Sequence, residues 1–294
     1  KGVYELVITI VSGLLPYESG KTWFTVSVGL ALRKAGYSVG VFKPVAGHNI
    51  WYSPRTFLES IKLGILVGND ILAYYRTMLV DDIPTSNPIA IAALPPDPLK
   101  YTRVEDYMEN FENIESISVL TRIYNCKQRF IEHYVHPENT EKVSKTCKRI
   151  VEKLQESLNA KSKPFSDVSR YLTSSLVEED LDYCLKTIST GKDFVFVEGF
   201  NDTVTPYLKL LNTANVLVVV APSKVLVYEN MDHVREVINK ATSKLGYEGF
   251  RTRYVVKELK PDYVFETGLS LKPSPKKVHF DFMKILLEKH RLNS

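Results

Sequence analysis

The N-terminal part of the chain alternates between apolar runs and a helical pattern. An apolar run at Tyr4–Val11 has the length of a strand, Lys21–Lys34 has helical character, and Tyr37–Val45 is a second apolar run. Gly36 follows the helical run, where glycine is expected to end a helix. Two strands joined by a helix predict a parallel βαβ unit, and therefore an α/β fold with a doubly wound, mostly parallel sheet.

The C-terminal part returns to the same alternation. The continuous apolar run Val216–Ala221 is typical of a central parallel strand, which is buried on both faces. Strands are also predicted at Phe194–Val197 and Phe250–Val256, and helices at Tyr228–Leu245 and Val278–His290.

The middle of the chain, from about 101 to 190, has a different pattern. Apolar residues at Val143, Cys147, Val151, Leu154 and Leu158 follow helical spacing, and few strand-like runs interrupt this segment. We therefore expect one α/β domain over residues 1–294, with a mostly helical insertion at about 101–190.

Composition narrows the class of protein only moderately. The 294 residues are 44% hydrophobic and 24% charged, as in ordinary globular proteins. No apolar run reaches about 18 residues and the N-terminus lacks a signal-peptide pattern, so we expect no membrane partner. The three cysteines are widely spaced and form no CxxC pair, so a reducing, cytoplasmic compartment is expected. The net charge of +4 fits an anionic nucleotide but does not require nucleic acid.

The segment between the first predicted strand and the first predicted helix carries a phosphate-binding pattern. It reads Ser12-Gly13-Leu14-Leu15-Pro16-Tyr17-Glu18-Ser19-Gly20-Lys21-Thr22. In a P-loop, backbone N–H groups and the helix N-terminus bind phosphate. We expect Lys21 to reach the terminal phosphates of ATP and the Thr22 hydroxyl to bind Mg²⁺. The expected nucleotide-binding residues are Glu18, Ser19, Gly20, Lys21, Thr22 and Trp23.

This loop is longer than the usual Gly-x₄-Gly-Lys-Thr loop. Leu15 stands where the first glycine is expected, and the nearest glycine, Gly13, lies further upstream.

Three further residues could complete a nucleotide site. Glu198 ends an apolar strand, and ligands of open α/β folds bind at the carboxyl ends of strands. Asp70 begins a helix-like run, where it could cap the helix or bind Mg²⁺. Lys43 ends the second strand, because Pro44 cannot continue it, and could bind a substrate anion.

Five segments, in the same order along the chain, resemble motifs of dethiobiotin synthetase, a P-loop enzyme of the same broad group as the cobyrinate amide synthases. The segments are Glu18–Thr22, Phe42–Gly47, Asn69–Ala73, Asn87-Pro88 with Leu94–Pro98, and Val197–Gly199. The resemblance implies that Thr22, Asp70 and Glu198 bind Mg²⁺. It also implies that Lys21 contacts the phosphates of ATP and that Lys43 lies near a substrate carboxylate or carbamate.

The sequence departs from that family at the residues that read the substrate. Phe200-Asn201-Asp202 replaces a Gly-rich stretch, Gly47 and His48 replace a hydroxyl-bearing contact, and the Asn-Arg pair that reads adenine is missing. The fold and the phosphate chemistry are expected to carry over, whereas the biotin-pathway substrate is not.

Three functions follow as hypotheses. The first is an enzyme that transfers a phosphoryl group from Mg²⁺–ATP to a small anionic substrate, with Lys21 and Lys43 as catalytic residues. The second is a nucleotide-driven switch or assembly ATPase, for which a homodimer with nucleotide at its interface is the expected arrangement. The third is a polynucleotide 5′-hydroxyl kinase, which the modest charge disfavours.

Overall fold

The chain forms two compact units, which are described separately. The computed structural model describes residues 5–16, 18–270 and 272–291. The first unit contains Lys1–Pro44, Ala73–Ser86 and Cys184–Ser294, and the second contains Val45–Leu72 and Asn87–Tyr183. The sequence had predicted one domain with an insertion at about 101–190, whereas the second unit already begins at Val45, directly after the second strand.

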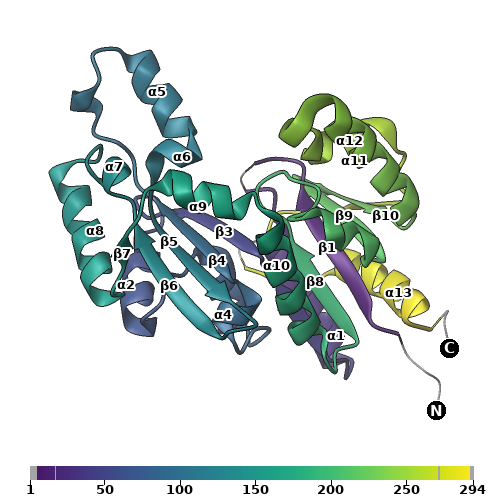
Figure 1. Cartoon of the computed structure of the whole chain (residues 1–294). Helices are drawn as coiled ribbons and strands as arrows, with labels where there is room; N and C mark the ends of the chain where they lie inside the picture. Colours follow the sequence, from purple (N-terminus) through teal and green to yellow (C-terminus); the bar gives the residue numbers. More distant parts are fainter. Residues whose placement is uncertain (1–4, 17, 271, 292–294) are drawn as a thin grey trace. The chain divides into compact units, whose positions relative to one another are not determined.

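The first unit is built on a six-stranded sheet in the order β11-β10-β9-β1-β8-β2 (Figure 1). Four of its strands, β2, β8, β1 and β9, run parallel, and β10 and β11 extend the sheet in antiparallel fashion. The α/β class predicted from the sequence is therefore confirmed. The strands are β1 Val7–Gly13, β2 Val39–Phe42, β8 Phe194–Glu198, β9 Val216–Ala221, β10 Lys224–Tyr228 and β11 Tyr263–Glu266.

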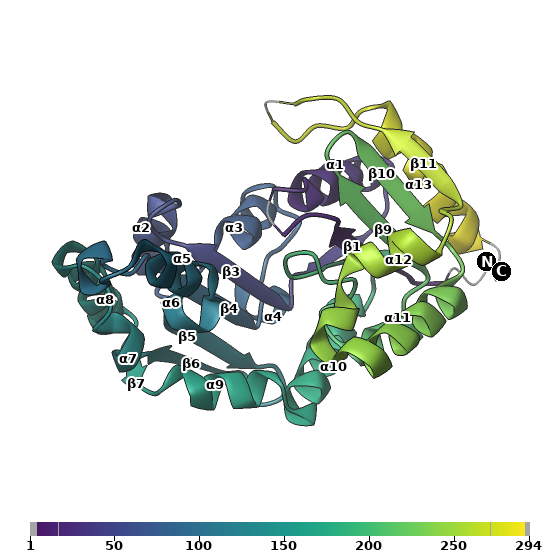
Figure 2. The same cartoon turned by 90° about the horizontal axis from the view of Figure 1, so that it is seen from above.

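Helices cover both faces of this sheet. Helix α1 (Lys21–Lys34) has the predicted bounds and packs with α13 (Lys277–Arg291) on one face, where the Phe24 and Phe282 ring centroids are 5.4 Å apart. Helix α11 (Met231–Leu245) lies on the other face (Figure 2). Strand β1 lies between β9 and β8, and all seven of its residues are buried, as expected for a central strand covered on both faces.

The strand predicted at Phe250–Val256 is wrong. Phe250 ends a short 3₁₀ turn that starts at Gly246, and α12 spans Thr252–Glu258. Its β-branched residues favour a strand locally, but Thr252 and Val255 are spaced three apart and both are buried. The face that carries these two residues packs against α11, and such tertiary contacts outweigh the weak local preference for a strand.

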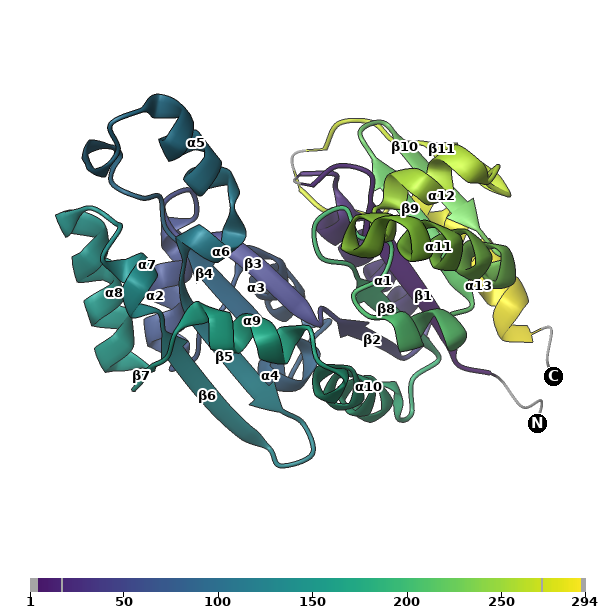
Figure 3. The ribbon, with the colours of Figure 1, turned by 45° about the horizontal axis from the view of Figure 1, so that its top comes forward.

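The second unit has its own five-stranded sheet, in the order β3-β4-β5-β6-β7 (Figure 3). Two long strands of this sheet, β5 and β6, lie in the segment that was expected to be mostly helical. They pair with each other as an antiparallel hairpin, and this long-range pairing leaves little mark on the local sequence. The strands are β3 Val45–Asn49, β4 Ile89–Ala93, β5 Ser118–Asn125, β6 Phe130–Val135 and β7 Lys161–Ser162.

Short helices fill the remainder of the chain, and the division between the two units falls within α3 and α10. They are α2 Pro54–Leu63, α3 Asn69–Arg76, α4 Ile83–Ser86, α5 Val104–Glu112, α6 Ile114–Ile117, α7 Pro137–Thr140, α8 Lys145–Ser157, α9 Phe165–Leu172 and α10 Ser175–Ser189.

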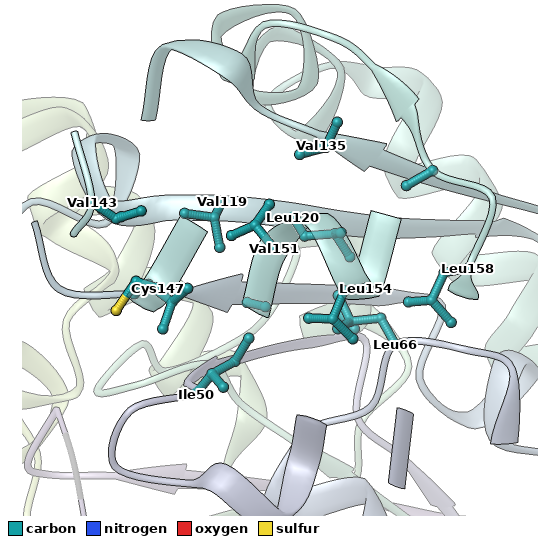
Figure 4. Close-up of a cluster of buried hydrophobic side chains, with 14 residues drawn as sticks. Ile50, Leu66, Val119, Leu120, Val135, Val143, Cys147, Val151, Leu154 and Leu158 are labelled. Atoms are coloured by element: carbon teal, nitrogen blue, oxygen red, sulfur yellow. The ribbon is translucent and has the colours of Figure 1, made fainter. Parts of the chain in front are cut away.

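The core of the second unit lies between its sheet and helix α8. Cys147, Val151 and Leu154 of α8 lie against the strand residues Val119 and Leu120, as Figure 4 shows. This is the helical spacing seen in the sequence, and Ser144 caps the helix by accepting a hydrogen bond from the Cys147 N–H.

Over residues 5–16, 18–270 and 272–291, no helix combines the length and the apolar character needed to cross a bilayer.

Candidate functional site

The loop between β1 and α1 has the backbone of an anion site. Gly20 is the N-cap of α1 and has φ 92°, a left-handed conformation that glycine adopts without strain. No side chain caps this helix, and its first turn holds no acidic residue. The first N–H groups of α1 and the positive end of its dipole therefore face the loop, where they favour a negatively charged group. Tyr17 lies outside the described residues, and Glu18 is exposed.

Gly13, at the end of β1, is the glycine that this long loop requires. A Cβ atom on Gly13 would lie 2.4 Å from the Ser19 Oγ and 2.8 Å from the Lys21 Nζ. The loop thus folds back onto the end of its own strand, and a side chain at position 13 would force Ser19 and Lys21 to move. The upstream glycine noted in the sequence serves the longer loop in this way.

Substitution of Gly13 tests this close approach. We expect Gly13→Ala to displace Ser19 and Lys21 and to weaken Mg²⁺–ATP binding at least about tenfold, the factor that corresponds to about 1.4 kcal/mol. Titration calorimetry measures the affinity. Gly40→Ala is the matched control, because its Cβ would lie 2.9 Å from the Ile188 Cγ2 and crowd the same sheet. An equal loss of affinity in both variants would contradict the assignment of Gly13 to the loop.

Lys21, the first residue of α1, is turned into the loop. Its ammonium donates to the backbone carbonyl of Asn201 at 2.8 Å and contacts the Ser19 Oγ at 3.4 Å. The side chain is only 8% exposed. A buried lysine whose ammonium is turned toward the start of its own helix is suited to bind phosphate there.

Two of the other predicted residues, Thr22 and Lys43, converge on the Glu198 carboxylate. Its Oε1 accepts from the Lys43 Nζ at 2.7 Å and from the Thr22 Oγ1 at 3.2 Å. Its Oε2 accepts from the Tyr74 hydroxyl. Glu198 ends β8, which pairs directly with β1, so the two strand ends deliver Glu198 and the loop to the same edge of the sheet.

Lys43 is buried and does not extend into solvent. Strand β2 ends at Phe42, the Lys43 N–H donates to the Ser86 carbonyl, and the side chain is 3% exposed. Besides pairing with Glu198, the ammonium donates to the Gly199 carbonyl at 2.9 Å. The structure therefore brings Thr22, Lys43 and Glu198 together, as the sequence predicts, and adds an ion pair between two of them.

The oxygen atoms at this point suit Mg²⁺. A hydroxyl and a carboxylate are hard ligands, and Mg²⁺ is commonly bound by one or two carboxylates together with waters and substrate phosphates. Within the described part of the chain, no group of three or more His, Cys, Asp or Glu side chains could hold a metal by itself. Thr22 and Glu198 would thus fit a cation that arrives with the nucleotide.

Asp70, the third predicted metal ligand, belongs to the second unit. It lies in the first turn of α3, where the positive end of the helix dipole stabilises its negative charge. Within that unit its carboxylate raises the pKa of His48, but burial has the larger effect and lowers that pKa to about 4. Its role as a metal ligand together with Thr22 and Glu198 stays a prediction.

A pocket of about 200 Å³ lies directly beside Gly20. Trp23 and Ser27 of α1, Val220 at the end of β9 and Thr267 and His279 are among the residues that line it. Burial lowers the pKa of His279 to about 4, so its imidazole is neutral at physiological pH. The pocket is smaller than the ~300–1,000 Å³ that encloses a whole small molecule, so it suits one part of a ligand held by the loop.

A larger hollow of about 540 Å³ lies elsewhere on the first unit, at the start of α11. Glu229, Asp232 and Asp262 contribute three carboxylates to its lining. Their charge opposes the binding of a phosphate, so size alone does not identify the nucleotide site.

Two residues of the site had no signal in the sequence. Tyr74 lies inside α3 and looks like an ordinary apolar helix position, although its hydroxyl reaches Glu198. Asn201 was noted only as a departure from a family motif, yet its backbone carbonyl contacts Lys21. Comparisons of the chain with family models and with curated proteins find no match.

Proposed function

We propose that the chain binds Mg²⁺–ATP through the β1–α1 loop and transfers a phosphoryl group to a small anionic substrate of the carboxylate or carbamate type. The observation that carries this proposal is the convergence of Thr22 and Lys43 on Glu198 beside the loop that holds Lys21. Thr22 and Glu198 would hold Mg²⁺, which would neutralise phosphate charge when bound. Lys21 would stabilise charge on the terminal phosphates.

The expected role of Lys43 differs between an enzyme and a nucleotide-driven switch. A buried lysine at a strand end, with its ammonium fixed by Glu198 and Gly199, is a preorganised positive charge. Such a charge can orient an anionic substrate for in-line attack. In a nucleotide-driven switch, the same ion pair would have only a structural role.

The test is ADP release with Mg²⁺–ATP, measured with and without panels of small carboxylic acids and of amines with bicarbonate. The enzyme proposal expects one class of compound to accelerate release, and an RNA 5′-hydroxyl oligonucleotide serves as the competing substrate class. Binding of ATP without acceleration by any compound would favour the switch. Absence of ATP binding in titration calorimetry, with EDTA as the metal control, would contradict both.

The pocket beside Gly20 gives the proposal a spectroscopic readout. Trp23 lines this pocket and is 42% exposed, so a purine base bound there should stack near its indole and quench its fluorescence. The chain has two tryptophans, and the other, Trp51, belongs to the second unit. We expect Trp51→Phe to retain quenching by Mg²⁺–ATP and Trp23→Phe to lose it. The opposite pattern would place the base elsewhere.

A further inference from the structure

The loop after β8 connects Lys21 to a distant segment of the first unit. Its Asn201 carbonyl accepts from the Lys21 ammonium at 2.8 Å. The next residue, Asp202, is bonded to Arg251 and Thr252, which lie about fifty positions further along the chain. One short loop thus touches the candidate phosphate site on one side and the start of α12 on the other.

The loop is built to hold the Asn201 carbonyl in one direction. Asn201 has φ 47°, a left-handed conformation that asparagine tolerates better than most residues. The turn around it is closed by Thr203, whose N–H and hydroxyl both donate to the Phe200 carbonyl, at 3.0 and 2.6 Å. At its start, a Cβ on Gly199 would lie 2.9 Å from the Thr203 carbonyl, so this compact turn requires glycine there.

Asp202 fastens the loop to the start of α12. Its backbone carbonyl accepts from both the N–H and the hydroxyl of Thr252, each at 2.8 Å. Its carboxylate pairs with the Arg251 guanidinium at 2.5 Å, and the Asp202 side chain is only 11% exposed. Since Asn201 and Asp202 are adjacent, the ion pair with Arg251 restrains the carbonyl that holds Lys21.

We infer that Asn201 competes with phosphate for Lys21, and that Asp202 and Arg251 are positioning residues that set the strength of this competition. The inference rests on the proposed nucleotide site. A carbonyl oxygen and a phosphate oxygen repel each other, so Lys21 turned back to Asn201 opposes binding. If only molecules whose Lys21 has left the Asn201 carbonyl can bind phosphate, the apparent affinity is lowered in proportion to the fraction of molecules in that state. Nucleotide binding therefore loosens the loop and its attachment to α12.

This inference predicts a gain of affinity, which a merely structural role for Arg251 would not produce. We expect Arg251→Ala to bind Mg²⁺–ATP about two- to fivefold more tightly than the wild type, the size expected for losing a partly exposed ion pair. Arg253→Ala is the matched control. Arg253 lies on the same helix and pairs with Glu248, as Arg251 also does, but has no bond to Asp202. Its affinity should equal that of the wild type.

Titration calorimetry measures these affinities, and two further measurements complete the test: the affinity of a second variant and the hydrogen exchange of one amide. Asp202→Asn keeps the backbone carbonyl that holds Thr252 and removes only the charge, so it should reproduce the gain if Arg251→Ala fails to fold. Hydrogen exchange of the Thr252 amide in the wild type should become about fivefold faster with Mg²⁺–ATP, as expected for weakening one hydrogen bond.

The outcomes separate this inference from the proposed function. Equal or weaker binding by both Arg251→Ala and Asp202→Asn, with normal binding by the wild type, would overturn the inference and leave the proposed function standing. Unchanged exchange of the Thr252 amide would likewise overturn the coupling to α12. If the wild type binds no Mg²⁺–ATP, the proposed function fails and the inference fails with it.

Discussion

Replacement of Lys21 by alanine is expected to reduce turnover of Mg²⁺–ATP strongly while the protein stays folded. Lys21 is the first residue of α1, and its ammonium lies within the loop that closes on Gly13. Loss of one charge aimed at a reacting phosphate costs about 2–4 kcal/mol of transition-state stabilisation. This corresponds to a fall in turnover of roughly 30- to 1,000-fold. ADP release and titration calorimetry measure the effect.

The matched control for Lys21 is Lys34, at the opposite end of the same helix. Lys34 lies in the last turn of α1 and is exposed, so Lys34→Ala removes an equal charge from the same helix without touching the loop. Turnover by that variant should match the wild type. Circular dichroism of both variants should be unchanged. Normal affinity and normal turnover in Lys21→Ala would disprove the phosphate-binding role of the β1–α1 loop.

The second large effect is expected at the buried ion pair. Lys43 and Glu198 are 3% and 1% exposed, and their charged atoms are 2.7 Å apart. Lys43→Met is unbranched and only one atom shorter than lysine, but it leaves the carboxylate without this cation. Removing one partner of a buried pair typically costs about 3–5 kcal/mol, because an uncompensated charge remains in the interior. Urea denaturation should show a loss of this size in the free energy of unfolding.

A double variant separates charge from packing at this position. Lys43→Met combined with Glu198→Gln removes both charges and should regain most of the lost stability. Mg²⁺-dependent turnover should be lost in this double variant, because Glu198 is the proposed cation ligand. Lys284→Met is the control, since its ion pair with Asp281 is exposed and should contribute at most about 1 kcal/mol. Equal losses in the free energy of unfolding for Lys43→Met and Lys284→Met would show that the buried ion pair stabilises the fold no more than an exposed one.

The elements found correctly from the sequence are those whose signal is local. Helix α1 and strand β9 have the predicted bounds, because a continuous apolar run or a helical period bounded by glycine needs no distant partner to be recognised. Strand β2 ends at Phe42, one residue before the end expected from Pro44, which has no N–H to donate to a neighbouring strand.

The elements missed are those that distant contacts decide. Thr252–Glu258 is helical because α11 covers one of its faces, although its β-branched residues favour a strand. Strands β5 and β6 gain their hydrogen bonds from each other and from the other strands of the second sheet. A pattern within one segment cannot report such pairing, since β propensity depends mainly on the neighbouring strands.

The candidate site divides in the same way. The sequence by itself determined the β1–α1 loop with Lys21 and Thr22, and the polar residues Lys43 and Glu198. Each of these residues lies at the end of a strand or at the start of a helix, which a local pattern can locate. Only the tertiary structure decided that Lys43 pairs with Glu198, that Tyr74 donates to the same carboxylate, and that Asn201 holds Lys21. These contacts join residues that are 124 to 180 positions apart in the chain. Only the packing of the sheet and its helices, which no local pattern encodes, brings them within hydrogen-bonding distance.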